Sequence, residues 1–459
     1  MTPVLLLASA IAGIILMIVL ILRFRLQPVL ALLLVSMFVA ILSGMPLDRI
    51  APAIEAGMGK TLGHIAIIIT LGAMIGKIVE ISGGAEVLAR TLIGRFGSRR
   101  IPLALTLAGF LIGIPVFFEV GVIMVMPIIY GVSRLTHRQI MVFALPMCVT
   151  MLTVHSFLPP HPGPAAAAAQ IGADLGRILA FGLPITLILG FTGYVIASRM
   201  TRREFSCSED IRRTVEEMSE AEGGVLAGEG TVHAPPPPFG IIVALILFPV
   251  VLIMSGTFVL SLTEAGTVLH NAAALCGAPM TALLIDTLLA GWLLGLSRGW
   301  SHVQVSEVVG SAVPGVAMVI LIAGAGGVFG NILVQSGIGH VVSGLLHASG
   351  LPVLALAFVL SALLRAIQGS TTVALVTTAG ILSPLLQTLT ITASQKALLC
   401  LPMGGGGLSI SHINDAGFWI FTKLTGIDTG ESLRTWTVLT SILGFLGFCM
   451  TAILWPLCA

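Results

Sequence analysis

Ionisable side chains are rare in this chain, and they gather at a few points inside long apolar runs. Charged residues make up 9% of the 459 residues, and apolar residues make up 56%. Arg365, His412 and Asp415 stand in such runs, where an ionisable group is costly and is a functional candidate by default. The planar guanidinium of an arginine suits a carboxylate held by two hydrogen bonds, and a buried acid can carry a proton. These residue types indicate recognition of a small organic anion together with proton movement.

Two polar clusters lie in the second half of the chain, one beginning at Arg365 and the other following four consecutive glycines, Gly404 to Gly407. Their hydroxyl, amide and imidazole groups can bond to an anionic, hydroxylated ligand. The predicted substrate contacts in this half are Arg365, Gln368, Gly369, Ser370, Thr371, Thr372, Ser411, His412 and Asn414. Structural alternatives stay open for each. Arg365 can pair with an acid of the protein or extend to the membrane surface, the hydroxyls can bond to their own helices, and Asn414 or Asp415 can be a helix N-cap.

The first half carries a matching set of rare polar residues. Glu119 stands between Phe118 and Val120, where burial favours the neutral carboxyl and suits a proton carrier; pairing with Arg365 is the alternative. Glu119 and Asp415 are the predicted proton-coupling residues, with Glu119 favoured. The predicted substrate contacts in this half are His155, Ser156 and His161, with satisfied polar groups of the interior as the alternative.

The composition predicts an integral membrane protein. Mean hydropathy is +1.08, and the charged fraction of 9% compares with roughly 25% in soluble domains. Many apolar stretches reach the length of about 20 residues that crosses a bilayer. The first of them, Val4 to Leu22, lacks a basic start and a cleavage site, so we interpret it as a retained helix.

Several classes of protein are disfavoured. The net charge of +2 gives no reason to expect nucleic acid as a partner. The six cysteines show no CxxC or metal-ligand spacing, so we expect no metal and no cofactor. The sequence lacks a P-loop, which argues against ATP-driven transport by this polypeptide. An intramembrane metalloenzyme would have to use His155, His161, His412 and Asp415, whose spacing matches no metallohydrolase motif.

The chain repeats itself. Gly72, Gly76 and Ser82 recur as Gly326, Gly330 and Ser336, at one offset (326 − 72 = 254). The tripeptide 145–147 (Leu-Pro-Met) likewise recurs at 401–403. Two related halves in a membrane chain suggest a transporter, because exchanging the shapes of the halves opens a central site to each side in turn. Repeated interruptions build an occluded site rather than a continuous pore, which disfavours a channel.

The predicted fold is an all-α polytopic membrane protein with two inverted-topology repeats, each with about five crossings, one re-entrant hairpin and one broken helix. Residues 1–198 form the first repeat, 199–238 a polar cytoplasmic linker and 239–459 the second repeat. The first repeat has predicted helices at 4–22, 28–45, 64–83 and 176–198, a surface piece at 48–62, a hairpin at 101–133 and a broken crossing at 139–172. The second has helices at 240–260, 280–297, 315–336 and 433–455, a surface piece at 302–313, a hairpin at 352–384 and a broken crossing at 397–424.

The predicted orientation rests on lysine and arginine, which collect on the cytoplasmic side of a membrane. With both termini outside and the linker inside, 16 of the 22 basic residues lie inside. A path without hairpins would separate Arg100 from Arg134, whereas a re-entrant hairpin keeps both on the cytoplasmic side.

Three motifs resemble the gluconate permease family, the gluconate:proton symporters of the wider ion-transporter superfamily. They are 155–164 (HSFLPPHPGP), 368–374 (QGSTTVA) and 411–419 (SHINDAGFW), and the likeness extends over most of both halves. The resemblance implies transport of gluconate and similar sugar acids, or of D-serine in some relatives, and often a homodimer. Sodium-coupled relatives in the superfamily carry Ser-Asn-Thr at the hairpin tips, where this chain has Phe118-Glu119-Val120 and Gly369-Ser370-Thr371.

The leading hypothesis is therefore a secondary transporter in the bacterial cytoplasmic membrane that imports gluconate or a related sugar acid with protons. The alternative is transport of another small organic anion or amino acid, such as glycerate, another aldonate or D-serine, possibly coupled to sodium. The expected partners are a small carboxylate substrate, membrane lipid and a second copy of the chain.

Overall fold

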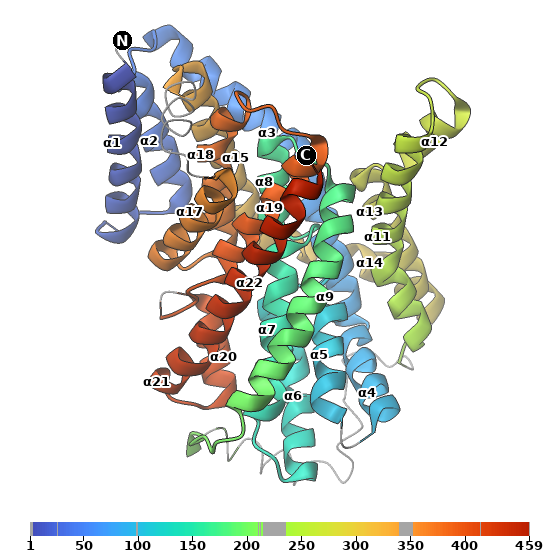
Figure 1. The fold of residues 1–459 in the computed structure, drawn as a ribbon. Helices are drawn as coiled ribbons and strands as arrows, with labels where there is room; N and C mark the ends of the chain where they lie inside the picture. The colour runs from blue at the N-terminus through green and yellow to red at the C-terminus, as the bar shows by residue number, and fades with distance from the viewer. Residues whose placement is uncertain are drawn as a thin grey trace.

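The computed structural model describes residues 3–24, 26–97, 100–209, 211, 213, 236–338, 352–413 and 415–458. These residues form a bundle of helices, with no strand among them (Figure 1). Eight helices in the described chain are long and apolar enough to cross a membrane. The prediction of an all-α polytopic protein is confirmed at this level.

The first half forms nine helices among the described residues, most of them close to the predicted bounds, whereas the helix Gly84–Phe96 was not predicted. They are α1 (Pro3–Leu22), α2 (Pro28–Leu42), α3 (Leu47–Ile81), α4 (Gly84–Phe96), α5 (Ile101–Ile112), α6 (Phe118–Thr136), α7 (Met141–Phe157), α8 (Pro162–Ile171) and α9 (Leu175–Met200). The predicted hairpin 101–133 is interrupted between α5 and α6, and the predicted crossing 139–172 is interrupted between α7 and α8.

Among the described residues, the second half has more elements than the first. It comprises α11 (Phe239–Leu262), α12 (Val268–Cys276), α13 (Pro279–Ala290), η2 (Gly291–Gly295), η3 (Leu296–Arg298), α14 (His302–Ser311), α15 (Val313–Gln335), α17 (Val353–Gln368), α18 (Thr371–Leu386), α19 (Ala393–Leu408), α20 (Ala416–Thr425), α21 (Thr429–Ser432), η4 (Leu433–Thr437), α22 (Val438–Leu454) and η5 (Trp455–Cys458). The bounds of α8 and α20 differ by the offset of the sequence repeat (416 − 162 = 254). The inversion of one half against the other stays a prediction.

The prediction of a separate surface piece at 48–62 was wrong, because α3 is one helix of 35 residues. Glycine weakens an isolated helix, but here Gly57 of α3 and Gly327 of α15 let the two helices pack closely together. A Cβ at Gly57 would lie 2.8 Å from the Cα of Val328, and one at Gly327 would lie 1.9 Å from the hydroxyl oxygen of Thr61. This close contact favours a continuous helix over the local propensity of the segment.

The second break begins later than predicted, because all four glycines at 404–407 lie inside α19. Each faces a different neighbour that leaves no room for a side chain. A Cβ on Gly404 would lie 2.6 Å from the backbone oxygen of Ser156. One on Gly405 would lie 2.6 Å from the backbone oxygen of Gly444, and one on Gly406 would lie 2.4 Å from that of Phe358. The glycines therefore serve close packing of α19 at the centre of the bundle.

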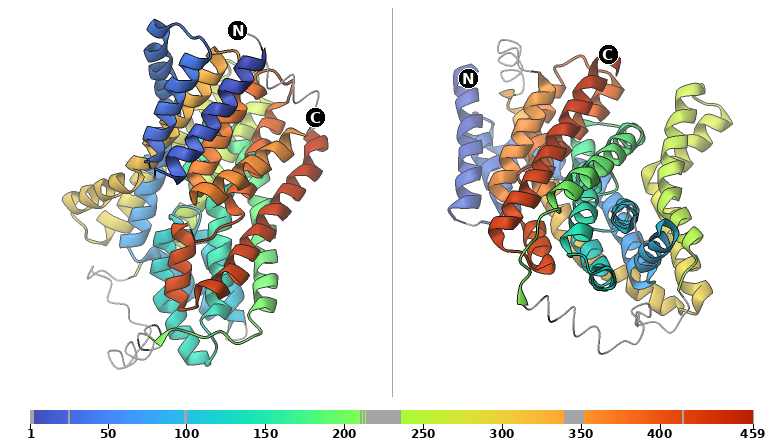
Figure 2. Two further views of the ribbon diagram at one scale, coloured as in Figure 1. Left: turned by 90° about the vertical axis from the view of Figure 1, so that its left-hand side faces the viewer. Right: turned by 60° about the horizontal axis from the view of Figure 1, so that its bottom comes forward.

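The two ends of the chain lie at one end of the molecule, and α9 ends at the opposite end (Figures 1 and 2). The segment that leaves α9 is held to the bundle over its first residues. The backbone N–H of Ser208 donates to the oxygen of Gly426 at 2.7 Å, and Arg203 pairs with Glu431 at 2.5 Å. Residues 214–235 of the predicted linker lie outside the described residues.

Candidate substrate site

The break between α17 and α18 consists of two residues. Gly369 has a φ of +75° and closes the C-terminus of α17 with a hydrogen bond from its N–H to the oxygen of Arg365. Ser370 then caps α18, its hydroxyl accepting from the N–H of Val373 at 3.3 Å. Glycine suits the first position, because other residues rarely adopt this left-handed conformation. The pair Gly369-Ser370 thus ends one helix and starts the next within the interior.

The break between α19 and α20 centres on Asp415. Its Oδ1 accepts from the N–H of Gly417 at 3.0 Å and caps α20, and its Oδ2 accepts from Arg365 and from the hydroxyl of Ser411. Only 5% of the Asp415 surface is exposed. The carboxylate has therefore committed its oxygen atoms to three donors of the protein.

Arg365 joins the two breaks. One Nη atom donates to Asp415 and the other to the carbonyl oxygen of Gly369, and the side chain is 2% exposed. Breaking such a buried pair leaves an uncompensated charge, which is strongly destabilising. Arg365 therefore holds the two breaks together through an ion pair, which was the alternative to direct substrate binding.

Glu119 lies in the first turn of α6, after a break at 113–117. The preceding residue, Phe118, contacts Gly417 at the start of α20 and the ring of Trp436, so the break before α6 and the break before α20 meet here. The side chain is half-buried, and we find no hydrogen bond from it to another described residue. Glu119 is thus an acid beside the ion pair whose carboxyl remains available.

The two histidines of the first half contact each other across the break between α7 and α8. The Nδ1 atoms of His155 and His161 lie 3.1 Å apart, and Nε2 of His161 bonds to the carbonyl oxygen of Gly113. A carbonyl only accepts, so a neutral His161 donates from Nε2 and accepts at Nδ1. His155 must then donate from Nδ1, which leaves its Nε2 as a hydrogen-bond acceptor. Both rings lie beside Phe117, with centroids 6.2 Å away.

Trp436 was not singled out from the sequence, yet it ties the two halves together. It lies in the π-helical turn η4, is fully buried, and donates from its indole nitrogen to the hydroxyl of Ser411 at 2.7 Å. Its ring lies 5.7 Å from that of Phe118, the neighbour of Glu119. A buried tryptophan needs a partner for its N–H, and π-turns are frequent at functional sites; together these were the available signals.

The remaining predicted residues divide into two groups. Some hydroxyls serve the packing: Ser156 donates to the oxygen of Leu152 in its own helix at 2.7 Å, and Thr371 donates to Gly407 at 3.0 Å. The second group consists of Ser370, Thr372 and His412, whose side chains are half-buried. Nε2 of His412 donates to the oxygen of Ala366 at 3.0 Å, so a neutral His412 has Nδ1 as an acceptor. The side chain of Gln368 and all of Asn414 lie outside the described residues.

The half-helices beyond the breaks begin close to one another. A Cβ at Gly163, in the first turn of α8, would lie 3.2 Å from the Cα of Thr372 in α18, and one at Gly417 in α20 would lie 3.0 Å from the ring of Phe118 in α6. Helix N-termini present unpaired N–H groups and a partial positive charge, which attract anions. At α20 the Asp415 carboxylate already occupies this position, and two of the first three residues of α8 are prolines. Of these three half-helices, α18, capped by the neutral Ser370, is therefore best placed to attract an anion. The site thus combines the N-terminal end of α18 with Glu119, Thr372, His155 and His412.

Comparisons with known proteins agree on one family. The model of the "GntP family permease" matches residues 4–458. The inner membrane permease YgbN of Escherichia coli (strain K12) is 44% identical over 99% of both chains. The gluconate permease of Bacillus subtilis (strain 168) is 36% identical over 95% of this chain and 96% of its own. The crystal structure of the YdaH transporter from Alcanivorax borkumensis has a similar fold, with a TM-score of 0.63 at 16% identity, over 95% of this chain and 100% of its own.

Proposed function

Because this chain belongs to the GntP family of permeases, we propose that it imports gluconate or a closely related sugar acid by proton symport with alternating access. Relatives named as gluconate permeases and transporters match nearly the whole chain, which supports transport of this class of anion. We also propose that the protein resides in the bacterial cytoplasmic membrane with residues 199–238 inside, and that it forms a homodimer there, as the family resemblance implies.

The observation that supports this substrate class is the convergence of groups from both halves. A half-helix N-terminus attracts a carboxylate. Ser370 and Thr372 lie at the break between α17 and α18, His412 lies at the break between α19 and α20, and all three side chains are half-buried. His155 and His412 each keep one ring nitrogen as an acceptor, which suits the hydroxyl groups of a sugar acid. Arg365 holds the breaks in place through Gly369 and Asp415.

Proton coupling is assigned to Glu119 rather than Asp415 in this proposal. Asp415 is occupied by Gly417, Arg365 and Ser411, whereas the Glu119 carboxyl is available. An arriving carboxylate disfavours a second negative charge nearby, so substrate binding promotes protonation of Glu119. By linkage, protonation then promotes substrate binding. This reciprocity is what a symporter requires.

The second candidate is a transporter of another small anion or amino acid, such as glycerate, another aldonate or D-serine, with sodium as the coupling ion.

Uptake by purified protein in proteoliposomes tests the function. A panel of labelled gluconate, other aldonates, glycerate and D-serine should show gluconate-type acids entering fastest under an inward proton gradient. Thr372→Ala and His412→Ala should each weaken apparent affinity about tenfold, because a lost hydrogen bond of about 1.4 kcal/mol corresponds to that factor. Uptake of D-serine but of no sugar acid, or dependence on sodium without protons, would replace this proposal by the alternative.

A further inference from the structure

One buried acid takes no part in the substrate site. Asp286 lies in α13 and is fully buried. Neither oxygen of its carboxyl has a hydrogen-bond partner among the described residues. Buried polar groups are almost always paired, so an unpaired carboxyl in the interior calls for an explanation.

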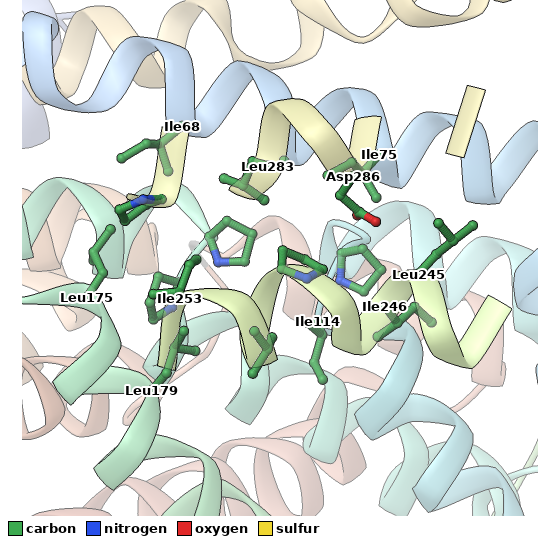
Figure 3. A pocket seen from close by; sticks show the side chains of 17 residues that line it. Ile68, Ile75, Ile114, Leu175, Leu179, Leu245, Ile246, Ile253, Leu283 and Asp286 are labelled. Atoms are coloured by element: carbon green, nitrogen blue, oxygen red, sulfur yellow. The ribbon is translucent and has the colours of Figure 1, made fainter. Parts of the chain in front are cut away.

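The carboxyl of Asp286 is directed into a small apolar cavity (Figure 3). Seventeen residues line this cavity, and Asp286 alone among them has an ionisable side chain. The cavity has a volume of about 20 Å³, measured as the space that the centre of a water molecule can occupy, and roughly 10–15 Å³ suffices for one water molecule. The carboxyl thus has room for a single small partner and is otherwise surrounded by hydrocarbon.

The cavity lies where two groups of elements meet. Asp286 and Leu283 of α13, with residues of α3 and α11, form one side; the other side includes Pro115, Pro159 and Pro160, which belong to the two breaks of the first half. A Cβ at Gly72 would lie 3.2 Å from Pro160, and one at Gly76 would lie 2.4 Å from the backbone oxygen of Pro115. The breaks that carry Glu119 and His161 therefore pack closely beside the cavity of Asp286.

The titratable groups on the surrounding elements are exposed or engaged elsewhere. Asp48, Arg49, Glu55 and Lys60 of α3 are exposed, and the side chain of His64 lies outside the described residues. On α3, Lys77 pairs with Glu80 at 2.7 Å. On α9, Arg177 donates to Ser394 at 2.7 Å, and on α12, His270 bonds to Thr263 at 3.1 Å. α11 and η2 contain no titratable residue. Neither carboxyl oxygen of Asp286 has a charged partner within hydrogen-bond distance among the described residues.

A proton is the cation that the carboxyl of Asp286 can hold without any further ligand. Sodium and larger cations require several oxygen ligands, and the side chains lining the cavity supply only the carboxyl of Asp286. An ionised carboxylate without a partner is costly in such surroundings, whereas the neutral carboxyl is tolerated far better. Closed packing of the cavity and protonation of Asp286 are therefore linked.

We propose that Asp286 binds a proton, and that this proton permits the packing of the first-half breaks against α3, α11 and α13 to close during transport. This inference rests on the proposed transport function. When the packing opens and water reaches the carboxyl, the proton can leave; the ionised group then opposes closure until it is protonated again. Because linkage is reciprocal, closure promotes proton binding to the same extent.

The test uses Asp286→Asn, a neutral variant of nearly the same shape, with Asp48→Asn as the matched control on an exposed acid of α3. Infrared spectra of the purified protein detect protonated carboxyls directly. We expect the Asn variant at position 286, but not the control, to lose one protonated-carboxyl signal that the wild type shows at neutral pH. An unchanged set of signals would overturn the proposal, whatever the transported substrate proves to be.

Exchange of saturating gluconate, at equal pH on both sides of proteoliposomes, provides the second measurement. Wild-type exchange should fall about tenfold for each pH unit above the titration point, as the protonated fraction falls, whereas the fall should be absent in Asp286→Asn. Asp286→Leu, also neutral, should behave in the same way and guards against misfolding of one variant. A wild-type pH profile in both folded variants would overturn the role in closure. If no sugar acid is exchanged at all, the proposed function fails, while the infrared result still decides whether Asp286 holds a proton.

Discussion

Asp415 is the residue on which the second-half breaks depend. It accepts from Arg365, Ser411 and the N–H of Gly417, and Ser411 in turn accepts from Trp436. The rarity of ionisable residues in apolar runs was enough to select Arg365 and Asp415 from the sequence. Their pairing was not predicted: Glu119 was the acid considered as a partner of Arg365, whereas the folded chain brings Arg365 of α17 to Asp415, the N-cap of α20.

Removing one partner of the ion pair should destabilise the protein strongly, and removing the second partner as well should restore part of the stability. Arg365→Ala should lower the free energy of unfolding by about 3–5 kcal/mol, because it leaves Asp415 buried without its charged partner. The double variant Arg365→Ala/Asp415→Ala should recover part of this loss. Thermal or chemical unfolding of the purified variants checks both expectations. A single variant as stable as the wild type would contradict the organising role of Arg365.

Glu119 carries the prediction for coupling. Glu119→Gln keeps the shape of the side chain but cannot release a proton, so uphill uptake on a pH gradient should be abolished while downhill exchange of substrate continues. Glu55→Gln, at an exposed position of α3, is the matched control and should accumulate substrate normally. If the Gln variant at 119 still concentrates substrate, the coupling group lies elsewhere, and His155 becomes the next candidate.

At the scale of elements, the sequence located all four helix interruptions, because proline, glycine and polar residues mark them. It did not predict the continuity of α3 or the helical state of Gly404 to Gly407. Both depend on contacts with elements far away in the sequence, such as α15 for α3 and α7, α17 and α22 for α19. Local propensity is overridden where backbones approach this closely.

Glycine packing in α19 gives a test at this scale. Gly406→Ala would place a Cβ 2.4 Å from the oxygen of Phe358, so α17 and α19 would have to separate, and the yield of folded, substrate-binding protein should fall. Gly94→Ala in α4 is the control: a Cβ there meets nothing within 4 Å, and alanine stabilises a helix by about 1 kcal/mol relative to glycine. Equal folded yields for the two variants would show that α19 tolerates a wider spacing.

The predicted re-entrant hairpin of α5 and α6 can be tested by its topology. Single cysteines at positions 100 and 134, in a background without native cysteines, should both react with an impermeant label from the cytoplasmic side. Both arginines at these positions are exposed, so access is not limited by packing. Reaction of the two positions from opposite sides of the membrane would mean that residues 101–136 cross it.

At the scale of the whole molecule, the repeat was visible in the sequence because the two copies keep their glycines at one offset. One pair of helices, α8 and α20, has bounds that differ by the same offset. The relative position of the ends also agrees with the predicted path, since both termini lie opposite the end of α9 (Figure 1). The prediction of which side faces the cytoplasm rests on the distribution of basic residues alone.

Proton movement on addition of substrate tests the central claim most directly. In weakly buffered proteoliposomes without sodium or an imposed gradient, external gluconate should drive protons inward together with the sugar acid, so a pH-sensitive dye outside should report alkalinisation in step with uptake. Glu119→Gln should take up gluconate without this change. Gluconate uptake by the wild type with no proton movement, or uptake that appears only when sodium is supplied, would contradict the account.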